Sequence, residues 1–195
     1  MQIGDSESGQ PVYRKLRKRR EYAGTARSLT FSCYQGFPFL AKDRTRGWFV
    51  ESLKSARNKH PVDLWAWVIM PEHVHLLVNP REENVIGKFQ ASLKESVARR
   101  AVAWLEANNP RWIPRVTVRE GHRVRRRFWQ PGGGYDRNIE QNAALLATID
   151  YLHHNPVRRG LAEAATDWRW SSARWYAGHQ DCLIEMDRTL PTIYE

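Results

Sequence analysis

The chain has 195 residues, enough for one domain with a hydrophobic core and short extensions. Its 31 Lys and Arg exceed its 21 Asp and Glu by ten, which predicts a polyanionic partner, either nucleic acid or an anionic membrane surface. The longest apolar run, residues 64–70, is too short to span a bilayer, and the polar first ten residues do not resemble a signal peptide. Cys33 and Cys182 are too few for a disulfide framework. We therefore expect a cytoplasmic protein with reduced cysteines and nucleic acid, not a membrane, as its partner.

A block of basic residues stands near the N-terminus. The stretch RKLRKRR, residues 14–20, is basic at every position except Leu16 and has no helical apolar stripe. We interpret residues 1–27 as an arm that contacts DNA phosphates; the alternative is a solvated tail that only improves solubility. The basic candidates in this arm are Arg14, Lys15, Arg17, Lys18, Arg19 and Arg20.

The first half of the chain predicts a strand, a helix and a hairpin. Residues 28–34 alternate between polar and apolar as a strand does, and apolar residues recur at helical spacing in 44–59. The continuous apolar run 64–70 predicts a buried strand. A Pro-Glu pair interrupts it, and 73–78 then alternates as a second strand, so the two should form a tight hairpin.

A long amphipathic helix is expected at 84–108, with Asn84 as its N-cap. Its apolar stripe contains Val85, Phe89, Leu93, Val97, Val102 and Leu105. Short strands are expected at 116–118 and 124–129, around a turn at 120–122.

A last helix is expected after a flexible break at the glycines 132–134. Asn138 should cap this helix, and Pro156 should end it at Asn155. The segment DWRWSS, residues 167–172, is typical of an aromatic-anchored tail that packs on the core.

The element order is β-α-β-β-α-β followed by a further helix. This is the order of an α+β, ferredoxin-like split βαβ sandwich, in which helices cover one face of an antiparallel sheet and the other face can take a ligand. We expect this domain at residues 28–178, followed by a tail at 179–195.

Two histidines are candidate metal ligands. His73 and His75 are two positions apart on a predicted strand, so their side chains point to one face while Val74 and Leu76 point to the other. Two adjacent imidazoles can chelate one divalent ion. The alternative is two half-exposed histidines that share a face by chance, and the spacing alone does not decide between them.

Tyr151 is the candidate nucleophile. It lies off the apolar stripe of the last helix (Leu145, Leu146, Ile149 and Leu152), beside small residues such as Ala147, with Asn155 one turn later. The phenol should be accessible, and the Asn155 amide oxygen could bind the same metal. The alternative is a tyrosine at a helix edge and an asparagine that only closes the helix.

Together these residues suit one reaction. A phenolate can attack a phosphodiester while a metal offsets the developing charge, which gives a covalent phosphotyrosine and a free 3′-hydroxyl. The energy of the broken bond is retained, so the strand can be resealed elsewhere without ATP.

Four ordered blocks resemble one known family. VIMPEHVHLLV (68–78) resembles the HUH signature of the IS200-like single-tyrosine transposases. YLHHNPVRRGL (151–161) resembles the tyrosine helix of their REP-associated relatives. FWQPGGGYDRNI (128–139) and DWRWSS (167–172) resemble further blocks of that family, in the same order.

The resemblance implies an HUH-type fold with a C-terminal helix that bears the nucleophile. It implies that His73 and His75 bind the metal, that Tyr151 is the nucleophile and that Asn155 is a third ligand. We expect Mg²⁺ or Mn²⁺ as the metal and single-stranded or hairpin DNA, such as REP-like elements, as the partner. The REP-associated branch implies a monomer, with a homodimer as the alternative.

Three further groups of residues have competing interpretations. The basic stretch RVRRR together with the aromatic Phe128 and Trp129 favours DNA contact over a charged edge strand. Its arginines are Arg123, Arg125, Arg126 and Arg127. His153 and His154 are expected to face solvent or to pack rather than to transfer protons. Glu72 is expected to be a carboxylate of the hairpin turn rather than a base.

The leading functional hypothesis is a metal-dependent endonuclease and strand-transferase for single-stranded DNA. One alternative is a nucleic-acid-binding module that has lost its chemistry, which predicts damage to the metal pair or the tyrosine; none is visible. Another is a hydrolytic metallonuclease that uses His-x-His and water, for which Tyr151 would be incidental. A covalent protein–DNA adduct separates the first hypothesis from the other two.

Overall fold

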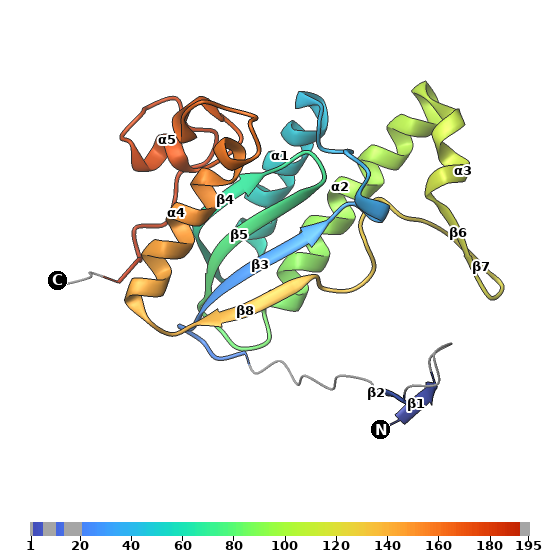
Figure 1. Ribbon diagram of the computed structural model, residues 1–195, viewed down its shortest axis with the longest axis horizontal. Helices are drawn as coiled ribbons and strands as arrows, with labels where there is room; N and C mark the ends of the chain where they lie inside the picture. The colour runs from blue at the N-terminus through green and yellow to red at the C-terminus, as the bar shows by residue number, and fades with distance from the viewer. Residues whose placement is uncertain (1, 6–10, 14–20, 192–195) are drawn as a thin grey trace.

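A four-stranded antiparallel sheet in the order β4-β5-β3-β8 lies at the centre of the computed structural model, which describes residues 2–5, 11–13 and 21–191 (Figure 1). Its strands are β3 (Ala26–Ser32), β4 (Val62–Ile69), β5 (His73–Pro80) and β8 (Tyr135–Ile139). One helix connects β3 to β4 and another connects β5 to β8. This arrangement confirms the predicted ferredoxin-like α+β sandwich.

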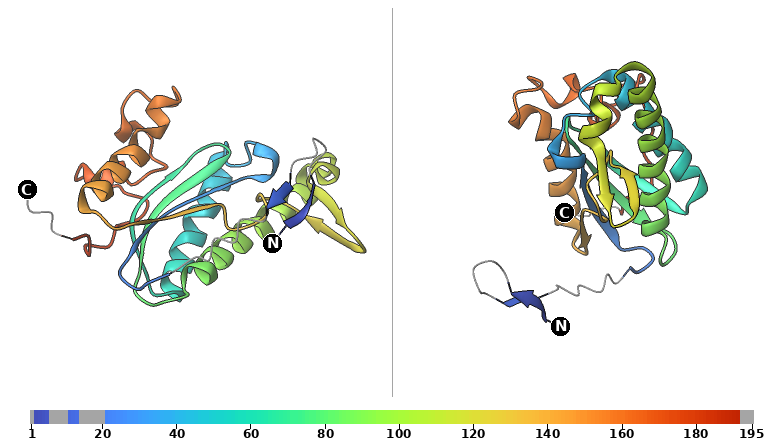
Figure 2. Two further views of the ribbon diagram at one scale, coloured as in Figure 1. Left: turned by 60° about the horizontal axis from the view of Figure 1, so that its bottom comes forward. Right: turned by 90° about the vertical axis from the view of Figure 1, so that its right-hand side faces the viewer.

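The helices α1 (Asp43–Lys59) and α2 (Ile86–Asn108) cover one face of this sheet, as the right-hand view of Figure 2 shows. Their apolar residues form one core cluster with the side chains that the strands direct toward them. Val74, Leu76 and Val78 belong to this cluster, as the alternation predicted.

The helix α4 (Asn142–Arg158) lies on the opposite face. Leu145, Ile149 and Leu152 pack there against strand residues that include Trp65 and Leu77. The prediction was wrong for Leu146, which is 48% exposed, because it follows Leu145 by one helical step and points away from the sheet.

Both predicted boundaries of the last helix are wrong. Asn138 lies in β8, where it pairs with Arg27, and is no helix cap. Pro156 lies inside α4, which continues to Arg158. A proline is tolerated in this last turn because its missing N–H removes only the bond to the carbonyl of Leu152.

The strands predicted at 116–118 and 124–129 form a separate hairpin, β6 (Thr117–Glu120) and β7 (Arg123–Arg126). It projects from the end of the molecule near the C-terminus of α2 (Figure 1). The fourth strand of the main sheet is therefore β8, which the sequence analysis took for the start of a helix.

The start of α2 also differs from the prediction. Val85 is the N-cap and Asn84 has a left-handed backbone, with a φ of 57°. The carboxylate of Glu21 accepts hydrogen bonds from the N–H groups of Val85 and Ile86, both at 2.7 Å. A residue far away in the sequence thus supplies the cap that Asn84 was expected to provide.

The segment DWRWSS lies along the edge of β4. Ile69 N–H donates to the Trp170 carbonyl and Ser172 N–H to the Trp67 carbonyl, both at 2.9 Å. Trp170 is buried in the core, and Trp168 and Trp175 pack against it, as predicted. Farther along, the Asp187 carboxylate accepts from Leu64 N–H at 2.8 Å, so the chain beyond this segment also covers β4.

The remaining elements are short. They are β1 (Gln2–Asp5), β2 (Pro11–Tyr13), η1 (Tyr34–Gly36), η2 (Pro110–Trp112), α3 (Ile113–Val116), η3 (Ala165–Asp167) and α5 (Ala173–Tyr176). Strands β1 and β2 pair with each other in antiparallel fashion within the predicted N-terminal arm. The six basic residues at 14–20 lie outside the described residues. In the described part of the chain, no helix combines the length and apolar character that a membrane span requires.

Candidate active site

The first and third residues of β5 form a close histidine pair. The Nε2 atoms of His73 and His75 are 2.9 Å apart, and the two rings are perpendicular. Two nitrogen ligands at about 2.1 Å from one octahedral ion, 90° apart, would be separated by about 3.0 Å. The pair therefore fits neighbouring positions around a single divalent ion.

The other ring nitrogens are held by hydrogen bonds. His73 Nδ1 donates to Glu72 Oε1 at 3.0 Å, which leaves the lone pair on Nε2. His75 Nδ1 lies 2.7 Å from Thr30 Oγ1. Burial lowers the pKa of His73 and lowers that of His75 to about 4, so both rings are neutral at neutral pH. Neutral imidazole is the form that binds a metal.

One face of α4 runs along this pair. The ring of Tyr151 lies 5.9 Å from that of His75, centroid to centroid. Two turns later, Arg159 donates to Glu72 Oε1 at 2.6 Å, beside His73. Asn155 occupies the turn between Tyr151 and Arg159, at the i+4 position from the tyrosine.

Tyr151 and His75 line one open cavity of about 510 Å³. The phenol is 46% exposed, and the neighbouring small residues Ala144, Ala147 and Thr148 line the same cavity, as predicted. Two cations flank the tyrosine. Arg137 also lines the cavity, and the Arg158 guanidinium lies 5.0 Å from the centre of the Tyr151 ring. An exposed phenol, two adjacent imidazoles and two guanidinium groups therefore lie in one part of the molecule.

A protein of Haemophilus influenzae that bears the name REP-associated tyrosine transposase is 27% identical to this chain over 158 residues. The match covers 77% of this chain and 82% of that protein. The chain is a relative of the REP-associated tyrosine transposases. The family resemblance inferred from the four sequence blocks is thereby confirmed, although no family model matches the chain.

The fold agrees with this relationship. A solved structure of a REP-associated tyrosine transposase bound to a REP hairpin aligns with a TM-score of 0.64, at 16% identity. The alignment covers 94% of this chain and 98% of that one. The present chain and that transposase thus share one fold.

Nothing in the sequence indicated that Thr30 and Arg159 lie at the site, and Glu72 was expected to be only a carboxylate of the hairpin turn. The alternation in 28–34 does place Thr30 on the face opposite Leu29 and Phe31, but only the pairing of β3 with β5 brings it opposite His75. Arg159 reaches Glu72 across 87 residues of sequence. Neither contact leaves a signal in a single sequence.

Gly134 was interpreted as part of a flexible break, and the structure corrects this. Its φ is +76°, and a Cβ atom there would lie 2.1 Å from the Thr30 carbonyl oxygen. Only glycine lets the backbone approach β3 so closely at the point where β8 begins. This close approach starts β8 beside the strand that carries Thr30.

The histidines that follow Tyr151 have different surroundings. His153 is buried, and its Nε2 lies 2.8 Å from Ser172 Oγ, so it joins α4 to the DWRWSS segment. Burial lowers its pKa to about 4. His154 is exposed and lies 2.9 Å from Asp150. Neither lines the Tyr151 cavity, in agreement with the predicted packing and solvent-facing roles.

The arginines of the β6–β7 hairpin are not brought into the Tyr151 cavity. Arg125 and Arg127 pair with Glu120, and Arg126 pairs with Glu106. Arg123 forms no ion pair with any residue that the structure describes. The hairpin therefore presents a positive surface whose charge is partly neutralised by its own neighbours.

Proposed function

We propose that this chain is a DNA transposase-like enzyme: a metal-dependent endonuclease and strand-transferase that acts on single-stranded, hairpin-bearing DNA. Tyr151 forms the covalent 5′-phosphotyrosine intermediate. The observation on which the proposal rests is the shared cavity of Tyr151 and His75, in a relative of the tyrosine transposases.

The proposed cleavage step exchanges one phosphate ester for another. The Tyr151 oxygen forms a bond to phosphorus as its proton passes to solvent, and the bond from phosphorus to the 3′ oxygen breaks. The leaving strand takes up a proton and ends in a free 3′-hydroxyl. An ion bound by His73 and His75 would offset charge on the phosphoryl oxygens. Attack by a 3′-hydroxyl on the phosphotyrosine reverses the exchange and seals the new junction.

Asn155 is proposed as a third ligand. Its neighbours on the same helix face, Tyr151 and Arg159, contact His75 and Glu72 respectively. Its Nδ2 donates to the Tyr151 carbonyl at 2.8 Å, which leaves the Oδ1 atom for a cation. Two imidazoles and an amide oxygen can bind one divalent ion, and the family resemblance is the reason for which we propose Mg²⁺ or Mn²⁺.

Several observations support DNA as the partner. The net charge is +10, and Arg137 and Arg158 lie beside the nucleophile. The related solved structure is bound to a REP hairpin, and we propose hairpin DNA for this chain as well. The basic residues at 14–20 and the arginines at 123–127 are proposed to contact phosphates. Because one chain supplies both Tyr151 and the adjacent histidine pair, we propose that the protein works as a monomer. We also propose that it works in the cytoplasm, as expected from its two reduced cysteines.

The deciding experiment uses hairpin-bearing single-stranded DNA with Mg²⁺ or Mn²⁺ and looks for an SDS-resistant adduct. We expect the adduct with the native chain and with Tyr135→Phe, which changes the other tyrosine of the cavity. The Tyr151→Phe variant should bind DNA but should form no adduct. An adduct with Tyr151→Phe would identify another nucleophile. Cleavage without any adduct would indicate a hydrolytic metallonuclease, and binding without cleavage would indicate a binding module.

A further inference from the structure

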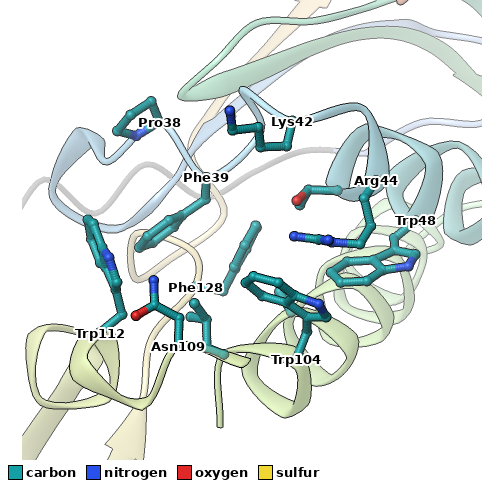
Figure 3. A pocket seen from close by; sticks show the side chains of 12 residues that line it. Pro38, Phe39, Lys42, Arg44, Trp48, Trp104, Asn109, Trp112 and Phe128 are labelled. Atoms are coloured by element: carbon teal, nitrogen blue, oxygen red, sulfur yellow. The ribbon is translucent and has the colours of Figure 1, made fainter. Parts of the chain in front are cut away.

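A second cavity, of about 280 Å³, opens between the start of α1, the end of α2 and the segment that contains Trp112 (Figure 3). It shares no lining residue with the Tyr151 cavity. Its volume is at the small end of the range for ligand sites, so it suits one flat ring system rather than a helix or a peptide. The proposed chemistry makes no use of it.

The walls of this cavity are aromatic and mutually supported. Phe39 stacks on the buried Phe128, with ring centroids 5.2 Å apart, and meets Trp112 edge to face at 5.8 Å. Trp112 and Trp104 are only half-buried, and Figure 3 shows both at the border of the pocket. Partly exposed tryptophans in fixed positions are suitable surfaces for stacking a planar ligand.

The positive charge at the rim of the pocket favours a planar ligand that carries negative charge. Lys42 and Arg44 are exposed at the rim, and none of the described residues that line the pocket is acidic. The Arg44 guanidinium is held 3.7 Å from the centre of the Trp104 ring. These cations would repel a quaternary ammonium or another positively charged ligand, whereas they complement the phosphate of a nucleotide.

Asn109 provides a polar group suited to a base edge. It lines the pocket, and its side chain has no hydrogen-bond partner among the described residues. A primary amide presents a donor and an acceptor side by side, the pattern with which asparagine binds nucleobases.

Backbone hydrogen bonds connect the wall of this cavity to the candidate active site. Leu40 N–H donates to the Pro71 carbonyl at 2.9 Å, and Cys33 N–H donates to the Glu72 carbonyl at 2.7 Å. The loop that carries Phe39 is therefore fixed to the turn just before His73. On its other side, the chain leaves the pocket at Trp112 and returns at Phe128, with the basic β6–β7 hairpin between them. The pocket is therefore connected both to the backbone that leads into the candidate active site and to the basic hairpin.

We propose that this pocket binds one unpaired nucleobase of single-stranded DNA, while Lys42 and Arg44 hold the adjoining phosphate. The proposal rests on the proposed DNA-processing function and adds to it a base-binding subsite separate from the reacting phosphate. The pocket fixes which unpaired nucleotide lies beside the hairpin, and so the register of the strand.

The test combines altered DNA with altered protein. The probe is a DNA hairpin with unpaired tails of mixed sequence, prepared as a series with one abasic residue at each tail position. For the native chain, one position should weaken binding about tenfold, as expected for the loss of one stacked base. The double variant Trp104→Leu, Trp112→Leu should bind the intact probe about tenfold more weakly and show no penalty at that position. Trp175→Leu, which changes a half-buried tryptophan outside the pocket, should keep the full penalty.

Photocrosslinking gives a readout that needs no variant. 5-Iododeoxyuridine at the sensitive tail position should crosslink to Phe39, Trp104 or Trp112 of the native chain. The proposal is overturned if the native chain binds the probe without any sensitive position, if the double variant keeps the penalty, or if the crosslinks map only to other segments. Failure of the proposed function looks different, because the native chain would then bind no probe or form no adduct at Tyr151.

Discussion

The two faces of the central sheet are covered to different extents. Beneath α1 and α2, Val74 and Leu76 of β5 are fully buried in a continuous apolar core. On the opposite face, α4 buries Leu77, but two residues earlier on the same strand His75 lines an open cavity. Two neighbouring positions on the same face of β5 therefore have different surroundings. Leu77 is covered by α4, whereas His75 borders the open Tyr151 cavity.

This difference shows how one strand serves two purposes. Alternate residues of β5 point to opposite faces, so the residues that stabilise the fold and the residues that would bind a metal are interleaved in sequence yet separated by the sheet. Substitutions on the two faces should therefore affect different measurements. Activity should respond on one face and the free energy of unfolding on the other.

The largest effect is expected for His75→Ala. The proposed metal supplies several kcal/mol of transition-state stabilisation, so the cleavage rate should fall by about a thousandfold. His73→Ala should behave similarly, and EDTA should stop the native enzyme until Mg²⁺ or Mn²⁺ is added back. Cleavage rates across a metal titration measure this, and circular dichroism should show a native fold. Full activity in excess chelator would contradict the metal mechanism.

Leu76→Ala should show the opposite pattern on the other face of the same strand. Leu76 is fully buried, so a cavity there should lower the free energy of unfolding by about 2–5 kcal/mol. Urea denaturation measures the loss. At a temperature where the variant is folded, adduct formation should approach the native rate. If Leu76→Ala lost activity while keeping its stability, the proposed separation between the two faces would be wrong.

A smaller effect is expected in acid, at the contact between α4 and the DWRWSS segment. Burial lowers the pKa of His153 to about 4 from the ordinary value of 6.5. The unfolded chain therefore binds a proton first, so stability is complete above pH 6.5 and falls as the pH drops toward 4. Protonation of His153 should lower the free energy of unfolding by an amount on the order of 3 kcal/mol once the pH has fallen below about 4. The pKa of the buried His75 is lowered as well, so the pH dependence of stability measured for the native chain includes the effects of both histidines.

His153→Gln should flatten the decline of the unfolding free energy between pH 6.5 and 4. His154→Gln provides a comparison, because that neighbouring histidine is exposed and acts on His153 only through its charge, so its loss should change the slope less. Urea denaturation at several pH values compares the three proteins. Parallel curves for the native chain and His153→Gln would show that protonation of His153 is not coupled to unfolding.

The sequence predicted the parts of the site that depend on local periodicity. Alternation placed His73 and His75 on one face, and helical spacing placed Tyr151 beside small residues. It could not predict the partners, because Thr30 and Arg159 reach the site only through strand pairing and helix docking. The error about β8 has a similar cause. Only Ile139 among the five residues Tyr135–Ile139 is a buried aliphatic residue, and the strand lies at an edge of the sheet, where it pairs only with β3, so it lacks the apolar pattern of a central strand.

Asn155 had two interpretations, a third metal ligand or a residue that only closes the helix. As a helix-closing residue it would stand at the end of α4, yet the helix continues past it to Arg158. Its amide nitrogen is bonded to the carbonyl of Tyr151, and the side chain is largely buried. Asn155 therefore does not end the helix, and its proposed role at the metal has to be tested by the metal titration.

The smallest effect is expected for this residue, since two histidines would still bind the ion. Asn155→Ala should raise the metal concentration needed for half-maximal cleavage by about tenfold. Asn155→Asp keeps an oxygen ligand but adds negative charge, so it should bind metal at least as well while slowing the chemical step, because a carboxylate makes the ion less electrophilic. Cleavage rates against Mg²⁺ and Mn²⁺ concentration for the three proteins separate these effects. Three superimposable curves would leave the histidine pair and water as the whole ligand set, and the bond from Asn155 to the Tyr151 carbonyl would then be its only role.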